Sequence, residues 1–156
     1  MRLWRLSRFR EPGRTFSGDG ARAFPGRWNE LGTPAVYASE HLSLAVLELL
    51  VHMMPTQMRV LHHAFPVDVP DDLVETLSGA DLPADWDAAD SPPSTQALGS
   101  TWAKSGRSLA LLVPSAVLPV ERNAVLNPAH LRFDEVKIGA PQPYSFDPRF
   151  LKVTPR

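Results

Sequence analysis

The sequence contains no cysteine among its 156 residues, so a disulfide framework and a thiolate-ligated zinc site are both excluded. It also has almost no net charge, because 16 Lys and Arg stand against 17 Asp and Glu. A chain without a basic field is a poor candidate for binding nucleic acid. No apolar run is long enough to cross a membrane. These absences favour a cytoplasmic globular protein that binds neither nucleic acid nor a membrane.

The length and composition are typical of a single domain over residues 1–156, with 44% hydrophobic and 21% charged residues. Strands and helices are mixed without the regular alternation of a doubly wound parallel sheet, which indicates the α+β class. Strands are predicted at residues 1–7, 35–39, 59–67, 108–113, 124–127 and 133–138, and helices at residues 40–54 and 95–105. Residues 8–31 are predicted to form an ordered loop, and residues 70–94 a surface excursion with one helical turn near residues 72–77.

The helix predicted at residues 40–54 is the most informative segment. Ser39 stands at its N-cap position, and Pro55 follows its end. The helix is apolar nearly all round, which indicates burial. Its polar side chains share one stripe at helical spacing: His41, Glu48 and His52. Because a buried carboxylate is unfavourable unless it is paired or faces a cleft, Glu48 is either part of a buried ion pair with an arginine or part of a site.

The residues before this helix supply two further candidates. Arg27 lies between Gly26, which allows a ligand to approach the backbone, and Trp28, which offers a stacking face. Tyr37 lies on the strand that leads into the helix, so its ring is either an ordinary core aromatic or a wall of the same cleft. No metal site is predicted, because His62-His63 are adjacent on a strand and point to opposite faces.

Arginine is concentrated at the start of the chain. Seven arginines fall in the first 27 residues: Arg2, Arg5, Arg8, Arg10, Arg14, Arg22 and Arg27. They form either a solvated surface or an edge that receives anionic groups such as phosphates, for which the planar guanidinium is well suited.

Short motifs along nearly the whole chain occur in a characteristic order. They are Trp4-Arg5-Leu6, Gly26-Arg27-Trp28-Asn29, Val36-Tyr37-Ala38-Ser39, residues 43–48, residues 108–115, residues 126–130 and Phe146-Asp147-Pro148-Arg149. In these residues the chain resembles the RES domain family, which is named for a characteristic arginine, glutamate and serine. Members form the toxin half of Xre–RES toxin–antitoxin pairs. One departure is Pro25, where many members have glycine.

The resemblance implies a fold and a site. The fold would be similar to that of ADP-ribosyltransferase toxins, a split two-sheet β core flanked by helices, with NAD between the sheets. Arg27, Tyr37 and Glu48 would line the active site. Ser115 would be the family's serine and bind the nicotinamide carboxamide or a ribose hydroxyl, unless it only caps a strand end. Arg5 resembles a further arginine near the NAD site. NAD would be the substrate, and neither a cofactor nor a metal is expected.

The activity that the resemblance implies is that of a toxin that cleaves the nicotinamide–ribose bond of NAD. Hydrolysis or phosphorolysis would deplete cellular NAD. The alternatives are a mono-ADP-ribosyltransferase that modifies a host protein and a non-catalytic module that only binds the antitoxin. The implied partner is a cognate Xre-type antitoxin. The expected assembly is a homodimer or a hetero-oligomer with that antitoxin.

Overall fold

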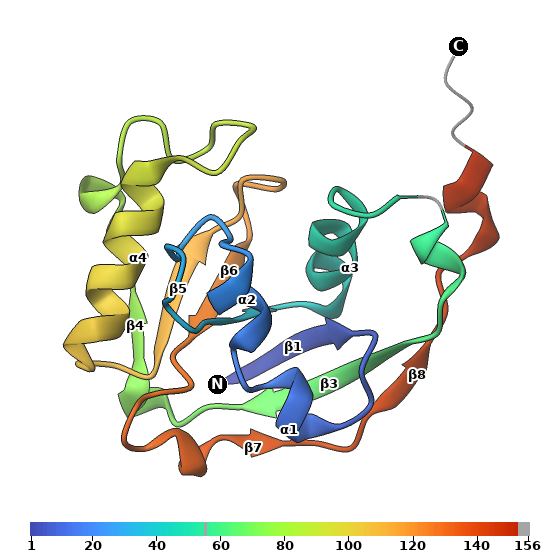
Figure 1. The fold of residues 1–156 in the computed structure, drawn as a ribbon, viewed down its shortest axis with the longest axis horizontal. Helices are drawn as coiled ribbons and strands as arrows, with labels where there is room; N and C mark the ends of the chain where they lie inside the picture. Colours follow the sequence, from blue (N-terminus) through green and yellow to red (C-terminus); the bar gives the residue numbers. More distant parts are fainter. Residues whose placement is uncertain (55, 153–156) are drawn as a thin grey trace.

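A computed structural model describes residues 1–54 and 56–152 and shows a mixed β sheet with helices packed against it (Figure 1). Its strands are β1 (Arg2–Ser7), β2 (Val36–Ser39), β3 (His62–Asp68), β4 (Val74–Thr76), β5 (Ala110–Pro114), β6 (Arg122–Leu126), β7 (Lys137–Ile138) and β8 (Gln142–Tyr144). They are ordered β4-β5-β6-β2-β1-β3-β7, and β8 also pairs with β3. The predicted α+β class is confirmed.

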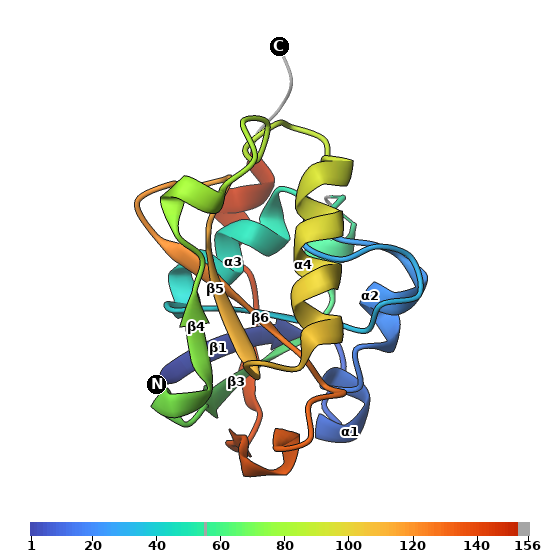
Figure 2. The ribbon, with the colours of Figure 1, turned by 90° about the vertical axis from the view of Figure 1, so that its left-hand side faces the viewer.

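The sheet is divided where β1 meets β2. The register between these strands consists of one pair, Trp4 with Ser39, whereas β1 pairs with β3 along its whole length and β2 pairs with all but the first residue of β6. The strands therefore form two halves, and Figure 2 shows β4, β5 and β6 running at a steep angle to β1 and β3. This is the split β core that the family resemblance implied.

The core has two parts because β5 and β6 bury side chains on both faces of the sheet. The inner cluster joins the two halves of the sheet and includes Leu3, Val36, Phe65, Leu112 and Leu126. The outer cluster packs against α4 (Pro93–Ser105) and includes Trp28, Trp102, Leu111, Val113 and Val125. Figure 2 shows α4 running beside β5 and β6. As predicted, Gly106 ends this helix, with a φ of 60° that favours glycine.

The helix that carries Glu48 is α3 (Leu42–Leu50), and it packs against β1 and β2. It is shorter at both ends than predicted. Ser39 is not its N-cap: it is the last residue of β2, its hydroxyl donates to Asn123 on β6, and His41 takes the cap position without a side-chain hydrogen bond. Pro55, expected after the helix, lies outside the described residues. In the part of the chain that the structure describes, no helix has both the length and the apolar character needed to cross a membrane.

The other predicted strands and helices agree with the structure to different degrees. The strands expected at residues 1–7, 35–39, 59–67, 108–113 and 124–127 are confirmed with shifted ends, as is the helix at 95–105. The segment at residues 8–31 contains two short helices, α1 (Pro12–Thr15) and α2 (Asp19–Ala23), which the prediction of a loop missed. Short 3-10 turns occupy Gln57–Arg59, Asp71–Leu73, Gly79–Asp81, Phe133–Glu135 and Pro148–Lys152.

Two predictions near the sheet edges are only partly right. The helical turn expected near residues 72–77 begins in the 3-10 turn Asp71–Leu73, but residues 74–76 form β4, which extends the sheet by parallel pairing with β5. The strand expected at residues 133–138 begins as a 3-10 turn and is extended only in β7, while the unpredicted β8 pairs with β3. These edge strands are two or three residues long, too short to show a periodic pattern in the sequence.

Candidate active site

Four of the five predicted site residues line one cavity. Its volume is about 900 Å³, within the range of small-molecule sites. Arg5 of β1, Arg27, Tyr37 of β2 and Glu48 of α3 all contribute to its wall, together with the segment 87–91. The cavity therefore lies where α3 and the two halves of the sheet meet.

Glu48 is half-buried and is held through one of its two carboxylate oxygens. Oε1 accepts a hydrogen bond of 2.6 Å from the Ser115 hydroxyl and another from Nδ2 of Asn123. Among the residues that the structure describes, Glu48 forms no ion pair, so the alternative of a buried pair with an arginine is not what the fold contains. The carboxylate instead belongs to the wall of the cavity.

Tyr37 presents its ring to the cavity and binds the Gly26–Asn29 turn through its hydroxyl. The hydroxyl donates to Oδ1 of Asn29 at 2.7 Å and accepts from the backbone N–H of Trp28 at 2.9 Å. Burial raises the pKa of Tyr37, so the side chain stays a neutral phenol. Gly26 allows this contact, because a Cβ at residue 26 would lie 2.6 Å from the Tyr37 hydroxyl. Tyr37 is thus both a wall of the cavity and an anchor of the turn.

Arg27 joins this turn to the 86–88 segment at the cavity wall. Its Nη1 donates to the carbonyl of Trp86 and its Nη2 to the carbonyl of Ala88, both at 2.8 Å. A guanidinium has five N–H donors, so these bonds leave three for other acceptors. Arg27 can therefore hold the 86–88 backbone and an anionic ligand at the same time.

Arg5 is a cation inside the fold without a carboxylate partner among the described residues. Its Nε donates to the carbonyl of Thr15 at 3.0 Å and its Nη1 to the carbonyl of Tyr37 at 2.6 Å. Burial lowers the pKa of Arg5 to about 10, which still leaves it protonated at neutral pH. Because neutral carbonyls do not cancel its charge, Arg5 makes this side of the cavity favourable for an anion.

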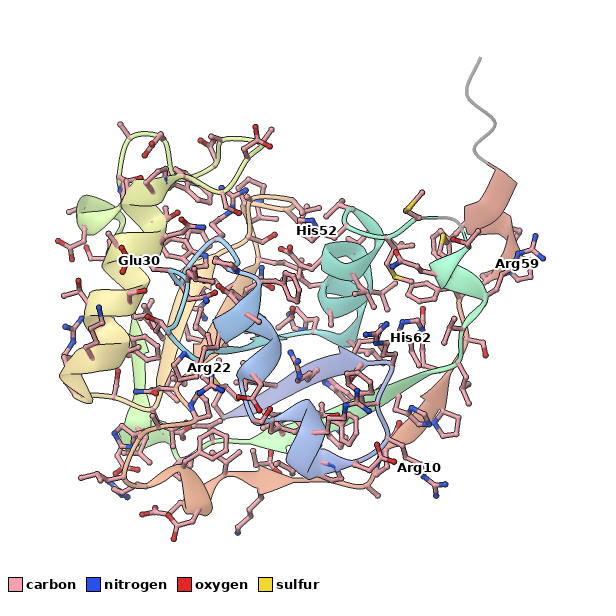
Figure 3. All side chains as sticks on the ribbon, viewed as in Figure 1. Arg10, Arg22, Glu30, His52, Arg59 and His62 are labelled. Carbon is pink, nitrogen blue, oxygen red and sulfur yellow. The ribbon has the colours of Figure 1, made fainter. Side chains whose placement is uncertain are left out.

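The remaining arginines of the first 27 residues do not join this site. Arg2 and Arg22 form exposed ion pairs, and Arg8 and Arg14 stack on Phe9. Figure 3 shows Arg10 and Arg22 on different parts of the surface, whereas His52 points from the end of α3 toward the cavity that it lines. The predicted anion-receiving edge is therefore reduced to Arg5 and Arg27. In residues 1–54 and 56–152 no group of three or more His, Asp or Glu is arranged to hold a metal ion.

Ser115 lies just after β5 and is fully buried. Its hydroxyl donates to Glu48 and accepts from the backbone N–H groups of Val117 at 3.1 Å and Leu118 at 2.9 Å. It therefore caps the strand end, as one of the two expectations proposed, and also binds the glutamate. It does not itself line the cavity.

Comparison with known proteins identifies the family. The model of the family described as RES domain matches residues 2–147. The chain belongs to the RES domain family. This RES domain is 39% identical over 128 residues to "Toxin Res" of Photorhabdus laumondii subsp. laumondii, covering 82% of each chain. It is 36% identical over 139 residues to "Prs ADP-ribosylating toxin" of Sphingobium sp., covering 87% of this chain and 86% of that one.

A solved structure supports the fold of this RES domain. It matches a chain in the crystal structure of the M. tuberculosis MbcT–MbcA toxin–antitoxin complex with a TM-score of 0.72. The match covers 97% of this chain and 86% of the other at 23% sequence identity. At that identity the likeness establishes a shared fold.

Sequence reasoning about the RES domain missed three polar residues that hold the site together: Ser39, Asn29 and Asn123. Asn29 belongs to the Gly26–Asn29 motif, but its contact with Tyr37 depends on the path of the turn. Asn123 precedes three buried residues of β6. A polar amide at the start of an apolar strand was the available signal, and it also fits an ordinary strand end.

Proposed function

We propose that this RES domain is the toxin of a toxin–antitoxin pair and acts in the cytoplasm by cleaving the nicotinamide–ribose bond of NAD. The observation that carries the proposal is the position of the Glu48 carboxylate, which lines a large cavity together with Tyr37 and the guanidinium groups of Arg5 and Arg27. The names of the relatives support the toxin role, because they are called "Toxin Res" and "Prs ADP-ribosylating toxin".

The chemistry of NAD matches these groups. Cleavage neutralises the positive charge of the nicotinamide ring, so nicotinamide is a good leaving group. The transition state resembles an oxocarbenium ion, as in glycoside cleavage. A carboxylate close to the ribose stabilises that developing positive charge, or orients the attacking nucleophile. Glu48 is the residue to which we assign this role.

The two arginines suit the pyrophosphate of NAD. Arg27 has N–H donors left after binding the carbonyls of Trp86 and Ala88, and Arg5 has a charge that no described carboxylate balances. Charge-assisted hydrogen bonds to phosphate oxygens are stronger than those between neutral groups. The Tyr37 ring then packs against the ribose or nicotinamide, while its hydroxyl keeps its bonds to the turn.

The acceptor of the ADP-ribosyl group distinguishes the forms of this activity. Water gives hydrolysis and phosphate gives phosphorolysis, and both deplete NAD. A protein side chain gives mono-ADP-ribosylation, and the name of the Sphingobium relative, "Prs ADP-ribosylating toxin", favours this alternative. All three begin with the same bond cleavage and place the same demand on Glu48.

Product analysis tests the proposal and identifies the acceptor. Purified protein is incubated with NAD in buffer, with inorganic phosphate, and with cell lysate, and nicotinamide and ADP-ribosyl products are measured by mass spectrometry. We expect nicotinamide release by the wild type and none by Glu48→Gln, with both proteins folded by circular dichroism. Glu40→Gln is the matched control, because Glu40 pairs with Arg122 away from the cavity wall. Wild-type protein without nicotinamide release would favour a non-catalytic antitoxin-binding module.

The partner is proposed to be an Xre-type antitoxin that covers the cavity. Several apolar side chains of the cavity wall are exposed to solvent, among them Phe24, Val51 and Val117. Exposed apolar surface of this kind is typical of a protein–protein contact. Co-expression with a cognate Xre-type antitoxin should yield a hetero-oligomer in which NAD cleavage is suppressed. Multi-angle light scattering separates this assembly from a homodimer of the RES domain alone.

A further inference from the structure

A chain of side-chain hydrogen bonds runs from the sheet to Glu48. The Ser39 hydroxyl donates to Oδ1 of Asn123 at 2.7 Å, and Nδ2 of Asn123 donates to Oε1 of Glu48. Ser39 and Asn123 are directly opposed in the β2–β6 register, so their side chains lie on the same face of the sheet. Ser39 also forms the single register pair between β1 and β2. Asn123 thus stands where the two halves of the sheet meet.

The Glu48 carboxylate only accepts hydrogen bonds, so it selects the Nδ2 end of the Asn123 amide, and the Ser39 hydroxyl satisfies the other end. That hydroxyl donates to Oδ1, while Nδ2 is directed at Glu48. If the amide turned over, Oδ1 would lie against the carboxylate oxygen, and two acceptors would meet without a proton between them. The Nδ2 donor of Asn123 therefore fixes the orientation of the Glu48 carboxylate.

Both donors to Glu48 act on the same oxygen. Ser115 and Asn123 bind Oε1, and no group among the described residues donates to Oε2. Two donors, one just after β5 and one on β6, define the orientation of the carboxylate more closely than one donor does. The second oxygen keeps its lone pairs for a ligand.

We propose that Asn123 is a positioning residue that orients the Glu48 carboxylate and directs its Oε2 to the substrate. The inference rests on the proposed function, because it assumes that Glu48 acts on the ribose of NAD. Asn123 itself lines the cavity, so direct binding of the substrate is the competing role. A purely structural role in β6 is the second alternative.

The experiment compares Asn123→Ala and Asn123→Asp in the wild-type and Glu48→Gln backgrounds. Asn123→Asp keeps the shape of the side chain and replaces its donor with an anionic acceptor. We expect kcat for NAD cleavage to fall roughly tenfold or more for Asn123→Ala and further for Asn123→Asp, with KM changed less than threefold, because a charge-assisted hydrogen bond is lost. Arg122→Gln is the control on the same strand, outside the cavity wall.

Thermal unfolding gives a readout that does not depend on activity. Asn123→Asp should lower the Tm in the wild-type background, because two carboxylates then oppose each other. In the Glu48→Gln background the same substitution should lower it much less, because the introduced amide can donate to the introduced carboxylate. A decrease in Tm that depends on the residue at position 48 is specific to a contact between the two residues.

The outcomes separate the possible roles. A raised KM with unchanged kcat would overturn the inference in favour of direct substrate binding. An equal loss of Tm in both backgrounds would overturn it in favour of an ordinary strand residue. If the wild type left NAD intact while the Tm decrease was smaller in the Glu48→Gln background, the contact would be supported and the proposed reaction would be wrong. If the wild type cleaved NAD and both Asn123 variants matched its kcat, the inference alone would fail.

Discussion

The Ser115 hydroxyl donates a hydrogen bond of 2.6 Å to Oε1 of Glu48, across 67 residues of chain. The same hydroxyl accepts from the N–H groups of Val117 and Leu118. A hydroxyl has one donor and two acceptor positions, so all three are occupied. A direct bond from Ser115 to the substrate would require the hydroxyl to give up Glu48. Ser115, which the family resemblance singled out as a site residue, is therefore placed to act through the glutamate.

Ser115→Ala is expected to affect turnover more than substrate binding. Loss of a hydrogen bond to a charged group costs about 1.5–3 kcal/mol, which corresponds to a decrease in kcat of roughly tenfold to a hundredfold. KM for NAD should stay close to that of the wild type. Steady-state kinetics of nicotinamide release measure both constants. Ser105→Ala at the exposed end of α4 is the matched control, and a large rise in KM for Ser115→Ala would show that the serine binds NAD directly.

Tyr37→Phe is expected to lower stability while retaining the ring that walls the cavity. The variant leaves the Trp28 N–H without its acceptor and removes a bond to Asn29, at a cost of about 1–3 kcal/mol in the free energy of unfolding. Urea denaturation followed by tryptophan fluorescence measures the loss. Unchanged stability would mean that the hydroxyl contacts contribute nothing to the fold.

The loss of folding stability at alkaline pH provides a separate test of the buried Tyr37 hydroxyl. Burial raises its pKa in the folded protein above that of an unfolded tyrosine, which is about 10. The folded state therefore holds this proton more tightly, so the stabilisation is complete below about pH 10 and is lost as the pH rises further. Urea denaturation between pH 8 and pH 11, roughly the range around the pKa of an unfolded tyrosine, measures this loss. The free energy of unfolding should decline less steeply with pH for Tyr37→Phe than for the wild type. Tyr144→Phe on the more exposed β8 is the comparison variant: burial raises the pKa of Tyr144 too, so its decline should also be shallower than that of the wild type, but by less than for Tyr37→Phe. An equal slope for wild type and Tyr37→Phe would contradict the assignment.

Gly26→Ala is expected to disturb both the turn and the cavity. The new Cβ would lie 2.6 Å from the Tyr37 hydroxyl, so the ring or the turn must move. We expect a loss of about 1–3 kcal/mol in stability together with reduced NAD cleavage, as is typical of overpacking. Gly13→Ala is the matched control, because a Cβ at that position meets open space. If both variants behaved alike in calorimetry and in the cleavage assay, the close approach would have no consequence.

Arg27→Lys is expected to make residues 86–90 at the cavity wall more mobile. A lysine has no planar fork and cannot reproduce the two parallel bonds to the carbonyls of Trp86 and Ala88. Hydrogen exchange of the amides at residues 86–90 should become several-fold faster, since their opening free energy falls. KM for NAD should rise. Arg107→Lys, at an exposed pair with Glu75, is the control, and protection of residues 86–90 equal to that of the wild type would contradict this role.

Much of the local structure could be predicted from the sequence because its cause is local. Short runs of consecutive apolar residues mark the buried strands around Ala110 and Ala124, and Gly106 marks the end of α4. The short edge strands β4 and β8 are not predicted, and β7 is only the end of the strand predicted at residues 133–138. Two or three residues are too few to show a periodic pattern, and they form strands only because a neighbouring strand pairs with them.

The candidate site divides in the same way. Local patterns are enough to show that Glu48 lies on an apolar helix and needs a pocket or a partner, and the motifs point to Arg5, Arg27, Tyr37 and Ser115. The folded chain adds that Ser115 and Asn123 bind the same carboxylate oxygen, and that Arg27 holds the backbone at Trp86 and Ala88. These contacts join residues 59 to 75 positions apart. They depend on strand register and on the bend between the two halves of the sheet, which no local pattern encodes.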